Sequence, residues 1–190
     1  MNTNSKISNI IIGITGASGA IYGYELINQL LKIDQIKKIA VIFSDNGAKV
    51  WEYEQMPKIP KNKKIEVFNN NDFFAAPASG SAQYNAMFIT PCSMGTLAAI
   101  ATGTSSNLIH RAADVTLKER RKLILLVREA PLNLIHIKNM ETITLAGGII
   151  FPASPFFYNR HEKLNDIVSD LISRLINISG INLPIKEWGK

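Results

Sequence analysis

The segment at residues 118–131, KERRKLILLVREAP, combines a basic cluster, an apolar run and a charged end. The apolar run Leu123–Val127 is typical of a strand that is buried on both faces of a parallel sheet. Arg128 and Glu129 follow this run directly, and ligands of open α/β sheets bind just beyond the carboxyl ends of the strands. The pattern therefore places a cation and a carboxylate where chemistry is expected. A salt-bridged helix followed by an ordinary strand end is the alternative interpretation.

Two other turns are rich in small and hydroxyl-bearing residues. The first, 13–19, has the spacing G-x-x-G-x-x-G, which lets backbone N–H groups approach a phosphate at a helix N-terminus. It lacks both the dinucleotide spacing G-x-G-x-x-G and the lysine of a P-loop, so a mononucleotide phosphate or a flavin is favoured over NAD or ATP. The second turn, 91–96, offers the hydroxyls of Ser93 and Thr96 beside Gly95. Tight turns and helix caps without a ligand are the alternative for both.

The types of side chain limit the chemistry further. His110, His136 and His161 share no ligand spacing, so no metal site is expected. The stretch 69–72, NNND, contains one acid, so the sequence offers no acidic cluster to hold Mg²⁺ around a diphosphate. An anionic phosphate would then be bound by cations and hydroxyls. The candidates are Lys118, Arg128, Tyr158 and Arg174. Because no histidine can be placed beside Cys92, this cysteine is interpreted as a packed small residue and not as a nucleophile.

The composition is that of an ordinary globular protein. Of the 190 residues, 46% are hydrophobic and 19% are charged, which suits one domain over 1–190 with short tails at 1–9 and 181–190. The net charge of +6 is scattered and no nucleic-acid motif is present, so no nucleic-acid partner is expected. No apolar stretch is long enough to span a bilayer. A single cysteine and a polar N-terminus without a signal-peptide pattern predict a cytoplasmic protein.

Strand-like and helix-like segments alternate along the chain. Strands are expected at 10–15, 39–43, 65–68, 86–90, 123–127 and 148–151. Helices are expected at 20–31, 48–54, 94–101, 104–121, 133–146 and 163–178. Residues 69–81 are irregular and are interpreted as a functional or interface loop. The alternation predicts an α/β single-domain doubly wound parallel sheet, a Rossmann/flavodoxin-like three-layer sandwich.

Five segments form a recognisable set: ITGASGA (14–20), APASGS (76–81), PCSMGTLAAIATG (91–103), NLIHRAADVTLKERRKLILLVREAPL (107–132) and FPASPFFY (151–158). Together they resemble the UbiX/Pad1 family of flavin prenyltransferases, long labelled 3-octaprenyl-4-hydroxybenzoate carboxy-lyases. The resemblance implies a metal-independent transfer of a dimethylallyl group from dimethylallyl monophosphate to N5 and C6 of reduced FMN. It also implies that the product, prenylated FMN, serves a UbiD-type decarboxylase, for example in ubiquinone biosynthesis, and that the protein is a homododecamer.

The same resemblance assigns roles to individual residues. The implied FMN site consists of Gly16, Ala17, Ser18, Ser44, Ser93, Met94, Gly95, Thr96 and Arg128. The implied site for the substrate phosphate consists of Lys118, Arg128, Tyr158 and Arg174. Ser18 and Glu129 match the family's positions for proton handling, and Lys118 is assigned to the leaving phosphate. Arg111, Phe73 and Trp188 match further site positions, although some members carry Trp in place of Phe73. Arg120, Arg121 and Lys122 are assigned to solvent or to subunit contacts.

Two other functions are compatible with a flavin site. The first is an FMN-dependent decarboxylase of the peptidyl- or pantothenoyl-cysteine type. Such enzymes depend on a catalytic histidine and on an Asn/Met loop pattern, and the sequence shows neither. The second is a flavin-binding subunit without activity, which the joint presence of Ser18, Lys118, Arg128 and Glu129 disfavours.

Overall fold

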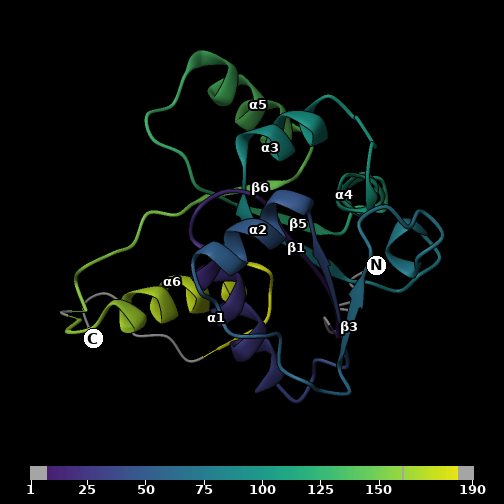
Figure 1. Ribbon diagram of the computed structural model, residues 1–190. Coiled ribbons are helices and arrows are strands. Elements are labelled where there is room, and N and C mark those ends of the chain that lie inside the picture. The colour runs from purple at the N-terminus through teal and green to yellow at the C-terminus, as the bar shows by residue number, and fades with distance from the viewer. Residues whose placement is uncertain (1–7, 160, 184–190) are drawn as a thin grey trace.

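The computed structural model describes residues 8–159 and 161–183, which build a six-stranded sheet whose neighbouring strands are all parallel. The strands are β1 (Asn9–Ile14), β2 (Lys38–Phe43), β3 (Ile65–Phe68), β4 (Ala86–Cys92), β5 (Lys122–Val127) and β6 (Ile149–Pro152). Their order is β3-β2-β1-β4-β5-β6 (Figure 1). The doubly wound parallel sheet expected from the sequence is confirmed.

Helices cover both faces of this sheet, so the fold has three layers (Figure 1). One face packs against α1 (Ala20–Leu31), α2 (Asp45–Tyr53) and α6 (Leu164–Ile178). The other face packs against α3 (Met94–Ala101), α4 (Leu108–Lys118) and α5 (Leu134–Leu145). β1 shows the consequence: Ile10 and Ile12 belong to the first core and Ile11 to the second, because successive side chains of a strand alternate between faces. With both faces covered, the central strands β1, β2, β4 and β5 carry continuous apolar stretches, whereas the edge strand β3 contains the exposed Glu66.

The chain reverses its progress across the sheet after β3. From β1 it moves outward to β2 and β3, and it then crosses to β4 on the opposite side of β1. β1 and β4 are thus neighbours whose following segments diverge, and ligands of doubly wound sheets bind in the crevice that this divergence creates. The turns after β1 and β4 are the two small-residue turns singled out in the sequence.

Several element boundaries differ from the sequence-based expectation. The helix expected at 104–121 is shorter, because Asn107 caps its beginning and Arg120 adopts a left-handed φ of 56° beyond its end. α2 begins at Asp45, three residues early, because Ser44 caps it. β4 continues to Cys92, and the loop 69–81 contains a short 3₁₀ helix, η1 (Ala76–Ala78). Within 8–159 and 161–183, no helix has the length and apolarity needed to cross a membrane.

Candidate active site

Thr15 joins the two turns that border the crevice. Its hydroxyl donates to the carbonyl oxygen of Pro91 at 2.8 Å and accepts from the backbone N–H of Ser93, also at 2.8 Å. The side chain is buried, with 1% of its surface exposed. A buried hydroxyl that uses both hydrogen-bonding functions fixes the end of β1 against the end of β4.

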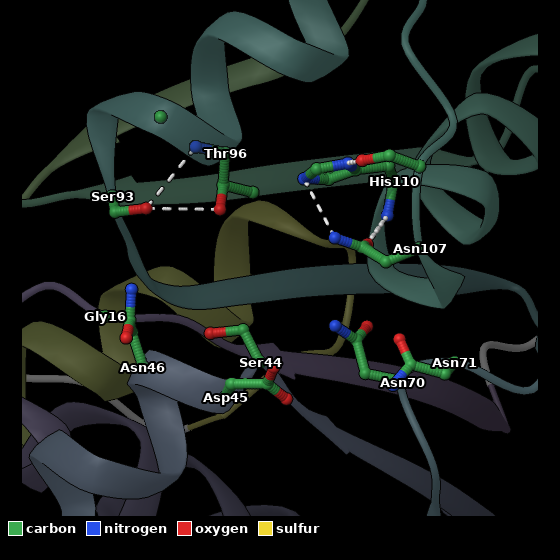
Figure 2. Close-up of a pocket in the computed structure, with 12 residues that line it drawn as sticks. Gly16, Ser44, Asp45, Asn46, Asn70, Asn71, Ser93, Thr96, Asn107 and His110 are labelled. Carbon is green, nitrogen blue, oxygen red and sulfur yellow. Dashed lines mark hydrogen bonds between the residues drawn. The ribbon is translucent and has the colours of Figure 1, made fainter.

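A pocket of about 450 Å³ lies over these strand ends. Its lining is polar and comes from the segments that follow β1, β2, β3 and β4 and from the beginning of α4. In Figure 2, Ser93, Thr96, Asn107 and His110 face Gly16, Ser44, Asp45 and Asn46 across it, with Asn70 and Asn71 beside them. The other residues that line the pocket are Gly95 and Ser106.

The N-termini of α2 and α3 open into this pocket. Ser44 caps α2 by accepting from Gly47 N–H at 3.0 Å, and Ser93 caps α3 by accepting from Thr96 N–H at 3.3 Å. Helix geometry leaves the first N–H groups of each helix without an intrahelical acceptor, so these groups can bind an anion. At Gly95 a Cβ atom would have nothing within 4 Å, which leaves room for a ligand directly against the backbone.

Two glycines make this arrangement possible. A Cβ atom at Gly47 would lie 2.2 Å from the carbonyl oxygen of Ile14, so only glycine lets the first turn of α2 pack on the end of β1. A Cβ atom at Gly16 would lie 2.6 Å from Cβ of Asn46. The close contact of the β1 turn with α2 therefore requires glycine on both sides.

The N-terminus of α4, by contrast, is satisfied by asparagines. Leu108 N–H donates to the carbonyl oxygen of Asn70 at 2.7 Å, and Ile109 N–H donates to its Oδ1 at 3.1 Å. His110 N–H donates to Oδ1 of Asn107 at 2.9 Å. Both asparagines line the pocket, so α4 presents neutral amide side chains to it and not free backbone N–H groups.

The N-terminus of α1 is also occupied, at Gly19 and Ala20, which follow the turn residues Gly16, Ala17 and Ser18 that were assigned to FMN. The carboxylate of Glu54 accepts from Gly19 N–H at 2.9 Å and from Ala20 N–H at 2.7 Å. Burial alone would raise the pKa of Glu54, but the hydrogen bonds from Gly19, Ser18 and Ala20 and the charge of Arg128 outweigh it and lower the pKa. Glu54 is therefore an ionised group at this end of the crevice.

Arg128 links β5 to the same cluster. Its Nε donates to the carbonyl oxygen of Ser18 at 3.1 Å, and its backbone N–H donates to Cys92 O at 3.3 Å. The pKa of the nearby Tyr22 hydroxyl is raised, because burial outweighs the opposing effect of the Arg128 charge. Glu129 is exposed, and its Oε1 accepts from Ala130 N–H at 3.1 Å. The structure thus brings Ser18, Glu54 and Arg128 together at the carboxyl edge of the sheet.

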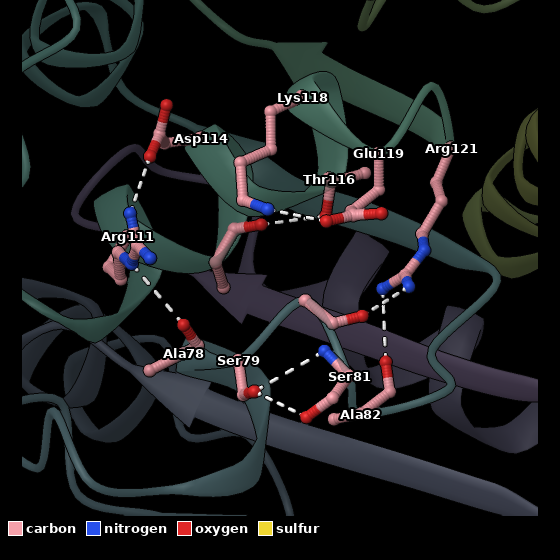
Figure 3. A network of polar contacts seen from close by, with 12 residues as sticks. Ala78, Ser79, Ser81, Ala82, Arg111, Asp114, Thr116, Lys118, Glu119 and Arg121 are labelled. Carbon is pink, nitrogen blue, oxygen red and sulfur yellow. Dashed lines mark hydrogen bonds and ion pairs between the residues drawn. The ribbon is translucent and has the colours of Figure 1, made fainter.

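Lys118 does not lie near this pocket within one chain. It ends α4, whose 11 residues span roughly 16 Å from the pocket-lining N-terminus. There it forms an ion pair with Glu119 beside Gly80 (Figure 3).

The neighbouring arginines bind the loop before β4. Arg111 Nε donates to Ala78 O at 3.2 Å, and Arg121 donates to Gly80 O at 2.6 Å and to Ala82 O at 3.0 Å (Figure 3). Arg111 also forms an ion pair with Asp114. Arg121, which was assigned to solvent or subunit contacts, therefore also holds this loop within its own chain.

Tyr158 and Arg174 lie in the segment after β6 and on α6. The Tyr158 ring stacks on Phe156 with 5.0 Å between centroids, and Arg174 is exposed. Asn159 is hydrogen-bonded to Asp170, one helical turn before Arg174, which joins the two segments. Phe73 is 44% exposed and does not line the pocket, and Trp188 lies outside the described residues.

Sequence reasoning placed Gly16, Ser44, Ser93, Gly95 and Thr96 in one site, and all of them line the pocket. Met94 and Ala17 are buried in the adjoining turns. Sequence reasoning did not identify Glu54 as a site residue. It also missed the pocket residues Asp45, Asn46, Asn70, Asn71, Ser106, Asn107 and His110. Asn107 was detectable as the N-cap of an amphipathic helix. Burial raises the pKa of the Cys92 thiol, which is 0% exposed, so Cys92 is a packed residue as expected.

Nearly the whole chain resembles known flavoproteins. Residues 1–182 match the family model described as Flavoprotein. The flavin prenyltransferase UbiX of Methanocaldococcus jannaschii is 42% identical over 95% of this chain and 98% of its own length. The crystal structure of AnUbiX (PadA1) in complex with FMN and dimethylallyl pyrophosphate has a TM-score of 0.90 at 34% identity and covers 97% of this chain and 99% of its own.

A dodecameric FMN-dependent UbiX-like decarboxylase from Escherichia coli O157:H7 has a TM-score of 0.87 at 34% identity, covering 96% of this chain and all of its own. The FMN-dependent cysteine decarboxylase TvaF reaches a TM-score of 0.60 at 12% identity, which shows the shared fold alone. The chain therefore belongs to the flavoprotein family and, within it, to the UbiX flavin prenyltransferases.

Proposed function

We propose that this protein is a flavin prenyltransferase that moves a dimethylallyl group from dimethylallyl monophosphate to N5 and C6 of reduced FMN. The observation that carries the proposal is the polar pocket at the β1–β4 crevice, with two open helix N-termini beside the Ser18–Glu54–Arg128 cluster. We further propose that the prenylated FMN is supplied to a UbiD-type decarboxylase and that the protein acts in the cytoplasm.

The pocket suits a flavin mononucleotide. The N-termini of α2 and α3 provide N–H groups for the phosphate. The positive field is strongest at α3, because the first turn of α2 carries the carboxylate of Asp45 and that of α3 carries no acidic residue. Ser44, Ser93 and Thr96 add hydroxyls, and Gly95 leaves space against the backbone. When bound in reduced form, FMN supplies the nucleophilic nitrogen and carbon that accept the prenyl group.

The cluster beside the pocket is assigned the proton handling. Ser18 Oγ lies beside the ionised Glu54, so we assign its hydroxyl to the proton at the reacting flavin nitrogen. Arg128 fixes the Ser18 backbone and adds positive charge for the departing phosphate. Glu129, which follows Arg128, is assigned as the acid that protonates this phosphate.

The remaining phosphate-binding candidates lie away from the pocket, which favours a site shared between copies of this chain. Lys118 lies at the far end of α4, and Tyr158 and Arg174 belong to the segments around α6. One chain does not gather these groups around its own pocket. We therefore propose a homo-oligomer, a dodecamer, in which a neighbouring copy contributes Lys118 to the phosphate site.

The direct test is an anaerobic incubation with reduced FMN and dimethylallyl monophosphate, analysed by mass spectrometry of the flavin. We expect a flavin that has gained the prenyl group, and the pyrophosphate ester run in parallel shows which ester is used. Glu129→Gln should still bind FMN but should slow prenyl transfer at least about 100-fold, as for the loss of a general acid. An unmodified flavin with the wild-type protein would contradict the proposal.

A mixing experiment tests the shared site. Lys118→Ala and Glu129→Gln proteins are each expected to be nearly inactive. If one site draws the two residues from different copies, oligomers reassembled from equal amounts should recover about a quarter of the wild-type activity, since half the copies carry each intact residue. If each site lies within one chain, the mixture recovers nothing, and the shared site is refuted while the prenyl transfer stands.

A further inference from the structure

The imidazole of His110 forms part of the pocket wall, and both of its nitrogens are engaged (Figure 2). Nδ1 lies 3.0 Å from Oγ of Ser106, and Nε2 lies 3.4 Å from Nδ2 of Asn107. The sequence pattern excludes His110 from a metal site but gives no role to His110, Ser106 or Asn107. All three residues line the pocket, and none of them has a role in the proton handling assigned above.

The helix cap determines the tautomer of this histidine. Asn107 Oδ1 accepts from His110 N–H at 2.9 Å, so the carboxamide of Asn107 must direct its NH₂ group at Nε2. An NH₂ group only donates, which requires Nε2 to be the unprotonated nitrogen. The ring proton therefore sits on Nδ1 and is donated to Ser106 Oγ.

This tautomer also determines the direction of the Ser106 hydroxyl. Because Oγ accepts from His110, the hydroxyl cannot donate back to the same nitrogen, and its own hydrogen is available to the pocket. We propose that Ser106 donates a hydrogen bond to an acceptor oxygen of the bound flavin mononucleotide, and that His110 is a positioning residue which fixes this direction. The inference rests on the proposed FMN site. It adds a fixed hydrogen-bond donor, the Ser106 hydroxyl, which favours an acceptor oxygen of the ligand at that position.

The surroundings keep the ring neutral. Burial lowers the pKa of His110. Asp45 of α2 lines the same pocket, and Arg111 and Asp114, which follow His110 on α4, form an ion pair with each other at 2.8 Å. A protonated ring would carry a hydrogen on Nε2 facing the NH₂ group of Asn107, so the Asn107 contact would be lost.

Flavin affinity tests the contact. Ser106→Ala should weaken FMN binding about 5- to 10-fold, the loss of one hydrogen bond, while Ser106→Thr should retain most of the affinity. Ser105→Ala is the matched control, because Ser105 is adjacent in sequence but does not line the pocket. Comparison with riboflavin then locates the acceptor: a loss confined to FMN identifies a phosphate oxygen, and an equal loss for both identifies a ribityl or ring oxygen. Unchanged FMN affinity in Ser106→Ala would overturn the inference.

The tautomer is tested independently of any ligand. Solid-state NMR of protein labelled with ¹⁵N-histidine, with His110→Phe for assignment, should show His110 protonated on Nδ1. His110→Phe should lose FMN affinity to a similar degree as Ser106→Ala, and the double variant should lose little more, because the two residues act through one hydrogen bond. An Nε2-protonated ring, or additive losses, would refute the relay. Failure of the wild-type protein to bind FMN would instead refute the proposed function.

Discussion

Four helices begin at the carboxyl edge of this sheet near the crevice, and they divide into two pairs. α1 and α4 begin with N–H groups that are already bonded, to Glu54 in one case and to Asn70 and Asn107 in the other. α2 and α3 are each capped by one serine hydroxyl and open into the pocket. A helix N-terminus attracts anions only when its N–H groups lack other acceptors. We therefore expect the phosphate at the open pair, and most of all at α3, because the first turn of α2 carries the pocket-lining Asp45 and that of α3 carries no acidic residue.

The largest effect is expected from a substitution that displaces an open N-terminus. Gly47→Ala would place a Cβ atom 2.2 Å from Ile14 O, where backbone and not a flexible side chain must move. We expect the free energy of unfolding to fall by about 3 kcal/mol and FMN binding to be lost. Denaturant unfolding at fixed protomer concentration measures the first effect and flavin fluorescence the second. Gly95→Ala, whose Cβ atom meets nothing within 4 Å, is the matched control for stability. Equal stability of the two variants would contradict this account.

The second prediction concerns a substitution that closes an open N-terminus in the way that Glu54 closes the N-terminus of α1. Gly95→Asp puts a carboxylate into free space at the start of α3. Because like charges brought together cost several kcal/mol, we expect FMN affinity to fall at least about 30-fold, with no loss of stability. Gly95→Asn has nearly the same size without the charge and separates repulsion from obstruction. If the two variants bind FMN equally, the phosphate does not lie at α3.

Much of this organisation follows from the sequence. The apolar run 123–127 and the turns at 13–19 and 91–96 were sufficient to predict a parallel sheet with ligand-binding turns, because strand burial and turn chemistry are local properties. Strand order is not local. The alternation predicts a doubly wound sheet but does not show at which strand the chain crosses, and the crossing from β3 to β4 creates the crevice.

The contacts at the site that the sequence did not predict are also non-local. Which N–H groups at α1 remain free depends on Glu54, 35 residues away from Gly19, and the role of Arg121 depends on the loop at Gly80, 41 residues away. Spacing along the chain does not report such contacts. Lys118 was predicted as a phosphate-binding residue from its charge and from the resemblance, and one chain does not place it at its own pocket.

The third prediction removes the charge that closes α1. Glu54→Gln keeps a side-chain oxygen but loses the charge–dipole attraction at Gly19 and Ala20, so we expect about 1 kcal/mol lower stability near neutral pH. Because the pKa of Glu54 is lowered in the folded protein from its usual 4.5, its contribution is present above that pH and is lost as the pH falls below it. The stability curves of the wild type and the variant should therefore converge in acid. A difference that does not change with pH would show that the carboxylate charge has no role.

The smallest expected effect concerns the closed N-terminus of α4. His110 lies in its first turn, where burial lowers the pKa below 6.5 and a positive charge would also oppose the helix dipole. The unfolded chain thus binds this proton more readily than the folded one, so the stability that neutral His110 confers is complete above pH 6.5 and is lost as the pH falls. Urea unfolding at a series of pH values below 7 measures the free energy of unfolding. As the pH falls, this free energy should decrease less steeply for His110→Gln than for the wild type. Ser106→Ala, which keeps the imidazole, should retain most of the wild-type slope. Equal slopes of unfolding free energy against pH for His110→Gln and the wild type would mean that the start of α4 tolerates a positive charge. The closed N-terminus of α4 would then not differ from the open ones in its preference for charge.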